Sequence, residues 1–95
     1  MHASIRRYIV RAGREEEAIQ HAQDGFLPIL KSIPGFIAYY FIDTGDGEMI
    51  GVSIYQDIES AERANESARA YIGEHIPETL SRTAIFDGRV AVHWP

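Results

Sequence analysis

The stretch from residue 36 to residue 56 constrains the fold of this chain more than any other. It consists of an apolar segment, FIAYYFID, the turn TGDG and a second segment, EMIGVSIYQ. Within the second segment two sets of side chains alternate with the period of two that is typical of a strand. One set is Ile50, Val52 and Ile54, and the other is Met49, Gly51, Ser53 and Tyr55. Because glycine and aspartate tolerate the backbone of tight turns, we predict an antiparallel hairpin of strands 36–43 and 48–56.

A strand and a helix are predicted before this hairpin. Residues 4–11 alternate as a strand, with Arg6 on the same face as Tyr8 and Val10. Residues 14–33 carry apolar side chains at helical spacing. Within that helix we expect a kink or a split near Pro28, because proline lacks a backbone donor and clashes with the preceding turn.

A helix and a strand are also predicted after the hairpin. Asp57 is a suitable N-cap for a helix that reaches about residue 76, and residues 77–80 are expected to form a short turn. The last strand is predicted over residues 82–93, with a bulge at Asp87-Gly88. The order βαββαβ predicts an α+β fold of the ferredoxin-like type, in which both helices cover one face of a four-stranded antiparallel sheet.

Length and composition set limits on function. The chain has 95 residues, enough for one domain spanning 1–95. Its 9 Lys and Arg against 14 Asp and Glu give a net charge of −5, which argues against nucleic acid or an anionic membrane as a partner. The absence of cysteine excludes thiol chemistry, and the four scattered histidines lack metal-site spacing, so we expect neither metal nor cofactor. Without a signal peptide or an apolar run long enough to span a bilayer, a cytoplasmic location is expected.

The face of the sheet away from the helices predicts self-association. We assign to that uncovered face Val10, Met49, Tyr55 and a row containing either Tyr39 or Tyr40. A patch of this size is too apolar for a monomer, so a second copy is expected to cover it. The prediction is a homodimer.

Several short motifs resemble the antibiotic biosynthesis monooxygenase (ABM) superfamily over about residues 5–93. They are Pro34-Gly35-Phe36, Tyr39-Tyr40, Asp43, Gly45-Asp46-Gly47, Ser53, and a helix that opens Asp57-x-x-x-Ala61 and carries Asn65. The resemblance implies a dimeric α+β barrel with a pocket between each sheet and its helices. Some members of the superfamily oxygenate polyphenolic substrates without a metal or an organic cofactor, whereas others degrade haem, isomerise lactones or have no known activity.

Asn65 and His75 are the two predicted catalytic residues. Asn65 lies in the apolar stripe of the second helix, where a buried amide needs hydrogen-bond partners. The resemblance implies that an asparagine on this helix helps to hold a substrate oxygen, while bonding to the neighbouring backbone or a partner chain is the alternative. His75 is a candidate general base near neutral pH, with a surface position or a helix cap as the alternative.

Five further residues are candidates for substrate binding: Arg7, Tyr40, Ser53, Tyr71 and His93. Arg7 would balance an anionic substrate if its face of the strand meets the helices. Tyr39 and Tyr40 point to opposite faces, so only one of them can line the pocket. Tyr71 takes the place of the pocket aromatic that some relatives carry on the second helix. His93 could also serve the interface, and His21 is expected to be solvated.

Two functions are carried forward as hypotheses. One is a cofactor-independent monooxygenase, or a related small enzyme, acting on an aromatic or polyketide-like substrate. The other is a non-enzymatic ligand-binding or stress-associated homodimer. A pocket closed by Phe26, Ile29 and Phe41 with no polar lining would contradict the enzyme, and a cavity that reaches Asn65 with a second polar group facing it would support it.

Overall fold

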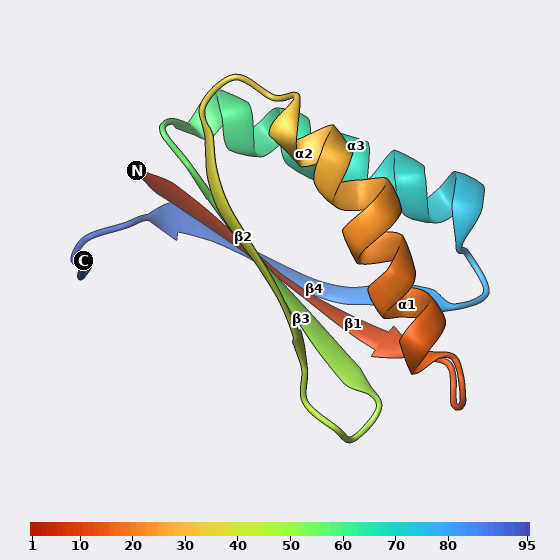
Figure 1. Ribbon diagram of the computed structural model, residues 1–95. Coiled ribbons are helices and arrows are strands. Elements are labelled where there is room, and N and C mark those ends of the chain that lie inside the picture. Colours follow the sequence, from red (N-terminus) through yellow and green to blue (C-terminus); the bar gives the residue numbers. More distant parts are fainter.

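The computed structural model describes residues 1–95 and has the predicted βαββαβ order. Its elements are β1 (His2–Val10), α1 (Glu15–His21), a π-helical segment η1 (Ala22–Phe26), α2 (Leu27–Lys31), β2 (Phe36–Asp43), β3 (Glu48–Tyr55), α3 (Ile58–His75) and β4 (Leu80–Arg89). The sheet has the strand order β2-β3-β1-β4 with all neighbours antiparallel. Both helical layers lie on one face of the sheet (Figure 1). The ferredoxin-like α+β prediction is confirmed.

The predicted first helix is divided, and proline supplies the reason. Residues 15–31 run as α1, η1 and α2 without leaving helical backbone angles. Pro28 stands in the first turn of α2, where its missing N–H leaves no intrahelical bond unmade. The π turn immediately before it absorbs the mismatch between the two α-helical segments. The second helix begins where predicted, since the Asp57 carboxylate accepts a hydrogen bond from the Ser60 backbone N–H at 2.9 Å.

The last strand differs from the prediction in both bounds and register. β4 ends at Arg89, which pairs with His2 at the beginning of β1, so no strand remains for residues beyond it. His93 therefore lies in an exposed tail and not in the sheet. The irregularity falls opposite Arg7 and Tyr8, around Thr83, and not at Asp87-Gly88.

Of the residues predicted for the uncovered sheet face, Val10, Met49 and Tyr55 were assigned wrongly, and Tyr40 is the alternative of the tyrosine row that lies there. Val10, Met49 and Tyr55 are buried beneath the helices, and Tyr39 packs there too. The open face instead exposes large apolar side chains: Ile5, Ile9, Tyr40, Ile42 and Phe86. Both faces of β1 and β3 are apolar, so alternation alone does not say which face the helices cover.

Two apolar clusters form the core between sheet and helices. One gathers Tyr8, Val10, Ala18, Met49, Ile76 and Leu80. The other gathers Phe26, Leu30, Tyr55, Ala61, Ala64 and Ala68. The strand register sets a polar row between them, in which Arg6 lies opposite Gly51 and Ser4 opposite Ser53.

None of the helices is both long and apolar enough to cross a membrane.

Candidate active site

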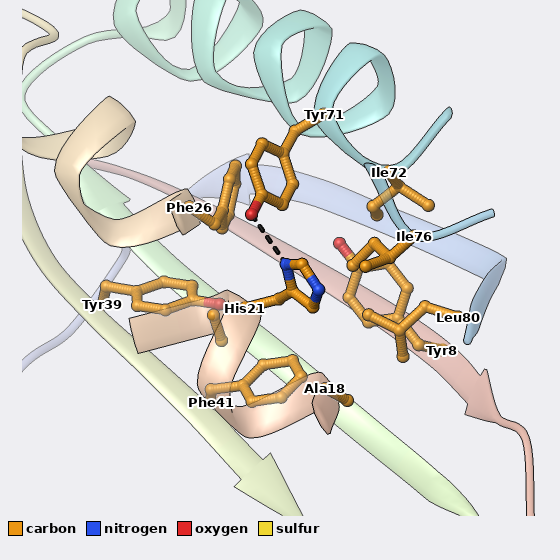
Figure 2. Close-up of a pocket in the computed structure, with 11 residues that line it drawn as sticks. Tyr8, Ala18, His21, Phe26, Tyr39, Phe41, Tyr71, Ile72, Ile76 and Leu80 are labelled. Carbon is orange, nitrogen blue, oxygen red and sulfur yellow. Dashed lines mark hydrogen bonds between the residues drawn. The ribbon is translucent and has the colours of Figure 1, made fainter. Parts of the chain in front are cut away.

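A small cavity lies between the sheet and the helices, where every element except α2 and β3 contributes to the wall. Its volume is about 20 Å³, close to the space that one water molecule needs. Figure 2 shows the aromatic side chains that dominate the lining, which are Tyr8, Phe26, Tyr39, Phe41 and Tyr71. Binding an aromatic ring here requires these walls to separate.

The polar edge of the cavity is a hydrogen bond between α1 and α3. His21 Nδ1 lies 2.9 Å from the Tyr71 hydroxyl, and both side chains line the cavity (Figure 2). The His75 ring packs against the outer side of Tyr71, with ring centroids 4.5 Å apart. The Phe26 ring lies on another side of Tyr71, at 6.3 Å. These contacts fix the phenol beside an imidazole that can accept or donate a proton.

A glycine in the π turn makes room for Tyr71. A Cβ atom built at Gly25 would overlap the Tyr71 hydroxyl oxygen. The close approach of α3 to η1 therefore depends on the missing side chain at this position. Gly25 lies within the helix predicted over residues 14–33, and the structure gives this glycine a role at the cavity.

A buried polar cluster lies next to the cavity, on the central strands. The Arg6 guanidinium donates to Asn65 Oδ1 at 3.2 Å and to Ser53 Oγ at 2.6 Å. Asn65 also exchanges hydrogen bonds with Ser4, at 3.1 and 3.0 Å, and donates to Asp87 Oδ2 at 3.2 Å. The partners of Asn65 are thus side chains of its own chain from β1 and β4, and not the neighbouring backbone.

Burial dominates the electrostatics of the tyrosines around this cluster. Burial raises the pKa of Tyr8 and of Tyr39 above the ordinary value of 10.0, and the Arg6 charge opposes part of each rise. The pKa of Tyr55 is raised by burial as well, against the effect of the adjacent Ser53 hydroxyl and of Arg6. These phenols stay protonated at neutral pH.

The structure brings only some of the predicted site residues together. Tyr71 lines the cavity, and His75 lies behind it with its side chain half exposed. Asn65 and Ser53 belong to the polar cluster, and neither lines the cavity. The cavity therefore has some polar lining but does not reach Asn65. It is neither the wholly apolar pocket that would contradict an enzyme nor the cavity at Asn65 that would support one.

Three predicted binding residues lie away from the cavity. Arg7 is on the open face of the sheet, where it donates to Thr83 at 3.2 Å and lies 3.4 Å from Glu48. Tyr40 is on the same face and is 59% exposed. His93 is in the tail, 2.9 Å from the Pro95 carbonyl oxygen. Arg7 would meet a substrate only if its face of β1 were covered by the helices. Because side chains alternate along a strand, Arg7 lies on the other face.

Two residues that the sequence analysis did not select are prominent in the site. The expectation that His21 is solvated was wrong, because its ring is half-buried against Tyr71. Arg6 is fully buried, although it was passed over in favour of Arg7. The placement of Arg6 beside Tyr8 and Val10 on one strand face was the available signal.

No three His, Asp or Glu side chains come together in a way that could hold a metal ion.

No protein-family model matches the sequence, and no curated protein matches it either. Solved structures do match the fold. SnoaB, a cofactor-independent oxygenase from Streptomyces nogalater, superposes with a TM-score of 0.75 at 12% identity, over 99% of this chain and 96% of that chain. The fold is that of the antibiotic biosynthesis monooxygenases.

Two further structures support this assignment of the fold. A Chloroflexus aurantiacus protein assigned to the antibiotic biosynthesis monooxygenases matches with a TM-score of 0.68 at 15% identity, over 98% of this chain and 96% of the other. MupZ from Pseudomonas fluorescens matches with a TM-score of 0.78 at 13% identity. That match covers 90% of this chain but only 65% of MupZ. The resemblance to the ABM superfamily is confirmed at the level of the fold.

Proposed function

We propose that this protein is a cofactor-independent monooxygenase of the ABM type that acts on a hydroxylated aromatic substrate. The observation that carries the proposal is the cavity between sheet and helices, which combines aromatic walls with the His21–Tyr71 hydrogen bond. A likeness in fold to a cofactor-independent oxygenase supports the same chemistry. His21 takes the role of proton acceptor first assigned to His75, because His21 lines the cavity and His75 does not.

The proposed reaction needs only the substrate and dioxygen. His21, coupled to Tyr71, accepts a proton from an activated ring carbon, and the resulting carbanion is oxidised by O₂. In sum a ring CH₂ and O₂ become a ring C=O and H₂O, so that one oxygen atom enters the substrate and the other leaves as water. Aromatic walls that exclude bulk water protect the carbanion from reprotonation.

Oxygen consumption with a panel of hydroxylated anthrones and naphthols tests the proposal. We expect wild type to consume oxygen with at least one of them, and His21→Gln and Tyr71→Phe to lower kcat by roughly 10²-fold or more. The matched control is Arg69→Gln, an exposed change on the same helix as Tyr71. Equal activity in all four proteins would show that His21 and Tyr71 take no part in the mechanism. Unchanged activity in Asn65→Ala would show the same for Asn65.

A non-enzymatic ligand-binding protein is the second candidate, because aromatic walls can bind a ring whether or not a reaction follows. A space of about 20 Å³ does not hold a substrate ring without rearrangement. If the aromatic panel binds in calorimetry while no member supports oxygen uptake, this second function replaces the first.

The exposed apolar face of the sheet supports a homodimer as the working unit. Phe86 is 60% exposed and Tyr40 59% exposed, next to exposed Ile5 and Ile42. A contiguous apolar face of this kind indicates an interaction surface. We expect light scattering to give twice the monomer mass at micromolar concentration and Phe86→Asp to shift it to the monomer. A monomeric wild type would contradict the proposal.

A further inference from the structure

The most deeply buried charged side chain of this protein is Arg6, in the middle of the covered sheet face. Its exposed fraction is 0%. Two of its nitrogens donate to uncharged oxygens, at 3.2 Å to Asn65 and at 2.6 Å to Ser53. The third nitrogen, Nε, has no hydrogen-bond partner although it is buried. A guanidinium that keeps an unused donor in the protein interior is rare and needs an explanation.

No carboxylate neutralises this buried charge directly. Arg6 takes part in no ion pair within 4.0 Å, and the nearest acid in the hydrogen-bond chain is Asp87. Asp87 is reached only through Asn65, and its other oxygen lies 2.6 Å from His2 Nε2. Burying a cation without an anion carries a large desolvation cost, which a bound anion would offset.

The guanidinium lies directly behind the wall of the cavity. It is centred 5.2 Å from the Phe26 ring, over its face. Its Nε is beside Gly51, at a point where the Tyr8 and Tyr39 rings also approach that glycine. Phe26, Tyr8 and Tyr39 all line the cavity. A ligand that parts these aromatic walls would therefore come next to the positive charge.

A second buried polar atom without a partner lies in the same place. The Tyr55 hydroxyl has no hydrogen-bond partner within 3.5 Å, although Ser53 and Arg6 lie close enough to lower its pKa. The Arg6 charge opposes the rise in pKa that burial gives Tyr8 and Tyr39, and both of these side chains line the cavity. One hydroxyl and one N–H are thus left free around a single positive charge.

We propose that Arg6 is the anion-binding residue of the cavity and that the ligand carries an acidic oxygen, a phenol or enol that is ionised at neutral pH. The ligand oxygen accepts from Arg6 Nε, and its ring packs between Phe26 and the tyrosines. Asn65 is a positioning residue that holds the guanidinium through its Oδ1. This inference rests on the proposed function in one respect only, the use of the same cavity.

Binding of two matched probes tests the inference. 2-Hydroxy-1,4-naphthoquinone is an anion at neutral pH, and 1,4-naphthoquinone is its neutral counterpart of almost equal size. The absence of cysteine removes the thiol that a quinone would alkylate. We expect titration calorimetry to show that wild type binds the anion about tenfold or more tightly than the neutral quinone. This preference should disappear when the pH is lowered far enough to protonate the probe.

Variants of Arg6 and Arg7 test which residue causes the preference for the anionic probe. Arg6→Met should lose the tenfold preference for the anion while keeping its affinity for the neutral quinone, and Arg6→Lys should keep part of it. Arg7→Met is the matched control, because it removes the same charge one residue away on the open face. A wild type without the preference, or an Arg6→Met variant that retains it, would overturn the proposal.

Further measurements distinguish a folding defect from a loss of anion binding, and anion binding from catalysis. If Arg6→Met does not fold, as judged by circular dichroism, the pH dependence of wild-type binding and the Arg6→Lys variant decide the question. Selective anion binding without oxygen consumption supports Arg6 as the anion site and contradicts the monooxygenase. Oxygen consumption that is equal in wild type and Arg6→Met, with ionised substrates, supports the enzyme and contradicts the anion site.

Discussion

Arg6 and Arg7 are neighbours in the sequence and opposites in the structure. Arg6 points under the helices, is fully buried and has only neutral partners. Arg7 points to the open face, where its charge is half exposed and lies 3.4 Å from Glu48. The same contrast separates the two faces of the whole sheet. The covered face holds an aromatic cavity beside a polar cluster, while the open face exposes several large apolar side chains. This difference is the basis for proposing ligand chemistry on one face and association on the other.

The largest expected contrast is in stability. Leu30, on the core side of α2, is 0% exposed, whereas Ile42 is 46% exposed on the open face. Leu30→Ala should lower the free energy of unfolding by about 2–5 kcal/mol, because it leaves a cavity. Ile42→Ala should cost under about 1 kcal/mol in a monomer. Urea unfolding at two protein concentrations measures both, and a cost at Ile42 that grows with concentration would show that a second copy covers the open face.

Two glycines give the next contrast. Gly25→Ala should cost about 1–3 kcal/mol, because the new methyl group displaces Tyr71 from His21. Gly73→Ala, in α3 with no atom within 4 Å of the new Cβ, should instead stabilise by about 0.5–1 kcal/mol through helix propensity. Thermal unfolding compares the pair. A Gly25→Ala protein as stable as wild type would show that Tyr71 is free to leave the cavity wall.

Alkaline pH should distinguish the buried tyrosines from the exposed one. Burial raises the pKa of Tyr8 and Tyr39, so the unfolded chain ionises first and the stability present below pH 10 is lost as the pH rises above it. The loss is worth about 1.4 kcal/mol per pH unit for each tyrosine that stays protonated in the fold. Tyr39→Phe should flatten the fall between pH 10 and 11, and Tyr40→Phe should not. Equal slopes in the two variants would contradict the burial of Tyr39.

Local patterns in the sequence predicted the elements because each pattern has a local physical cause. The hairpin followed from alternation and from glycines in its turn, which adopt positive φ at Gly45 and Gly47. The division of the first helix followed from Pro28, and the beginning of α3 from Asp57. The end of β4 was misplaced because it depends on where β1 begins, on the other side of the molecule.

The candidate site was predicted less well, because its parts are far apart in the chain. Tyr71 lines the cavity, and its hydrogen-bond partner there, His21, lies 50 residues away in the sequence. Asn65 meets Ser4 and Arg6 across 61 and 59 residues. No pattern within one strand or helix predicts such a meeting.

The order of the elements, the ferredoxin-like topology and the absence of thiol chemistry follow from the amino-acid sequence alone, since these depend on periodicity, turn residues and composition. The face of the sheet that the helices cover follows only from the three-dimensional packing. Both faces offer apolar side chains, so burial depends on the path of the helical connections and not on alternation. That choice buried Arg6 beside the cavity and left Arg7 outside, which is why the proposed anion site uses Arg6 and not Arg7.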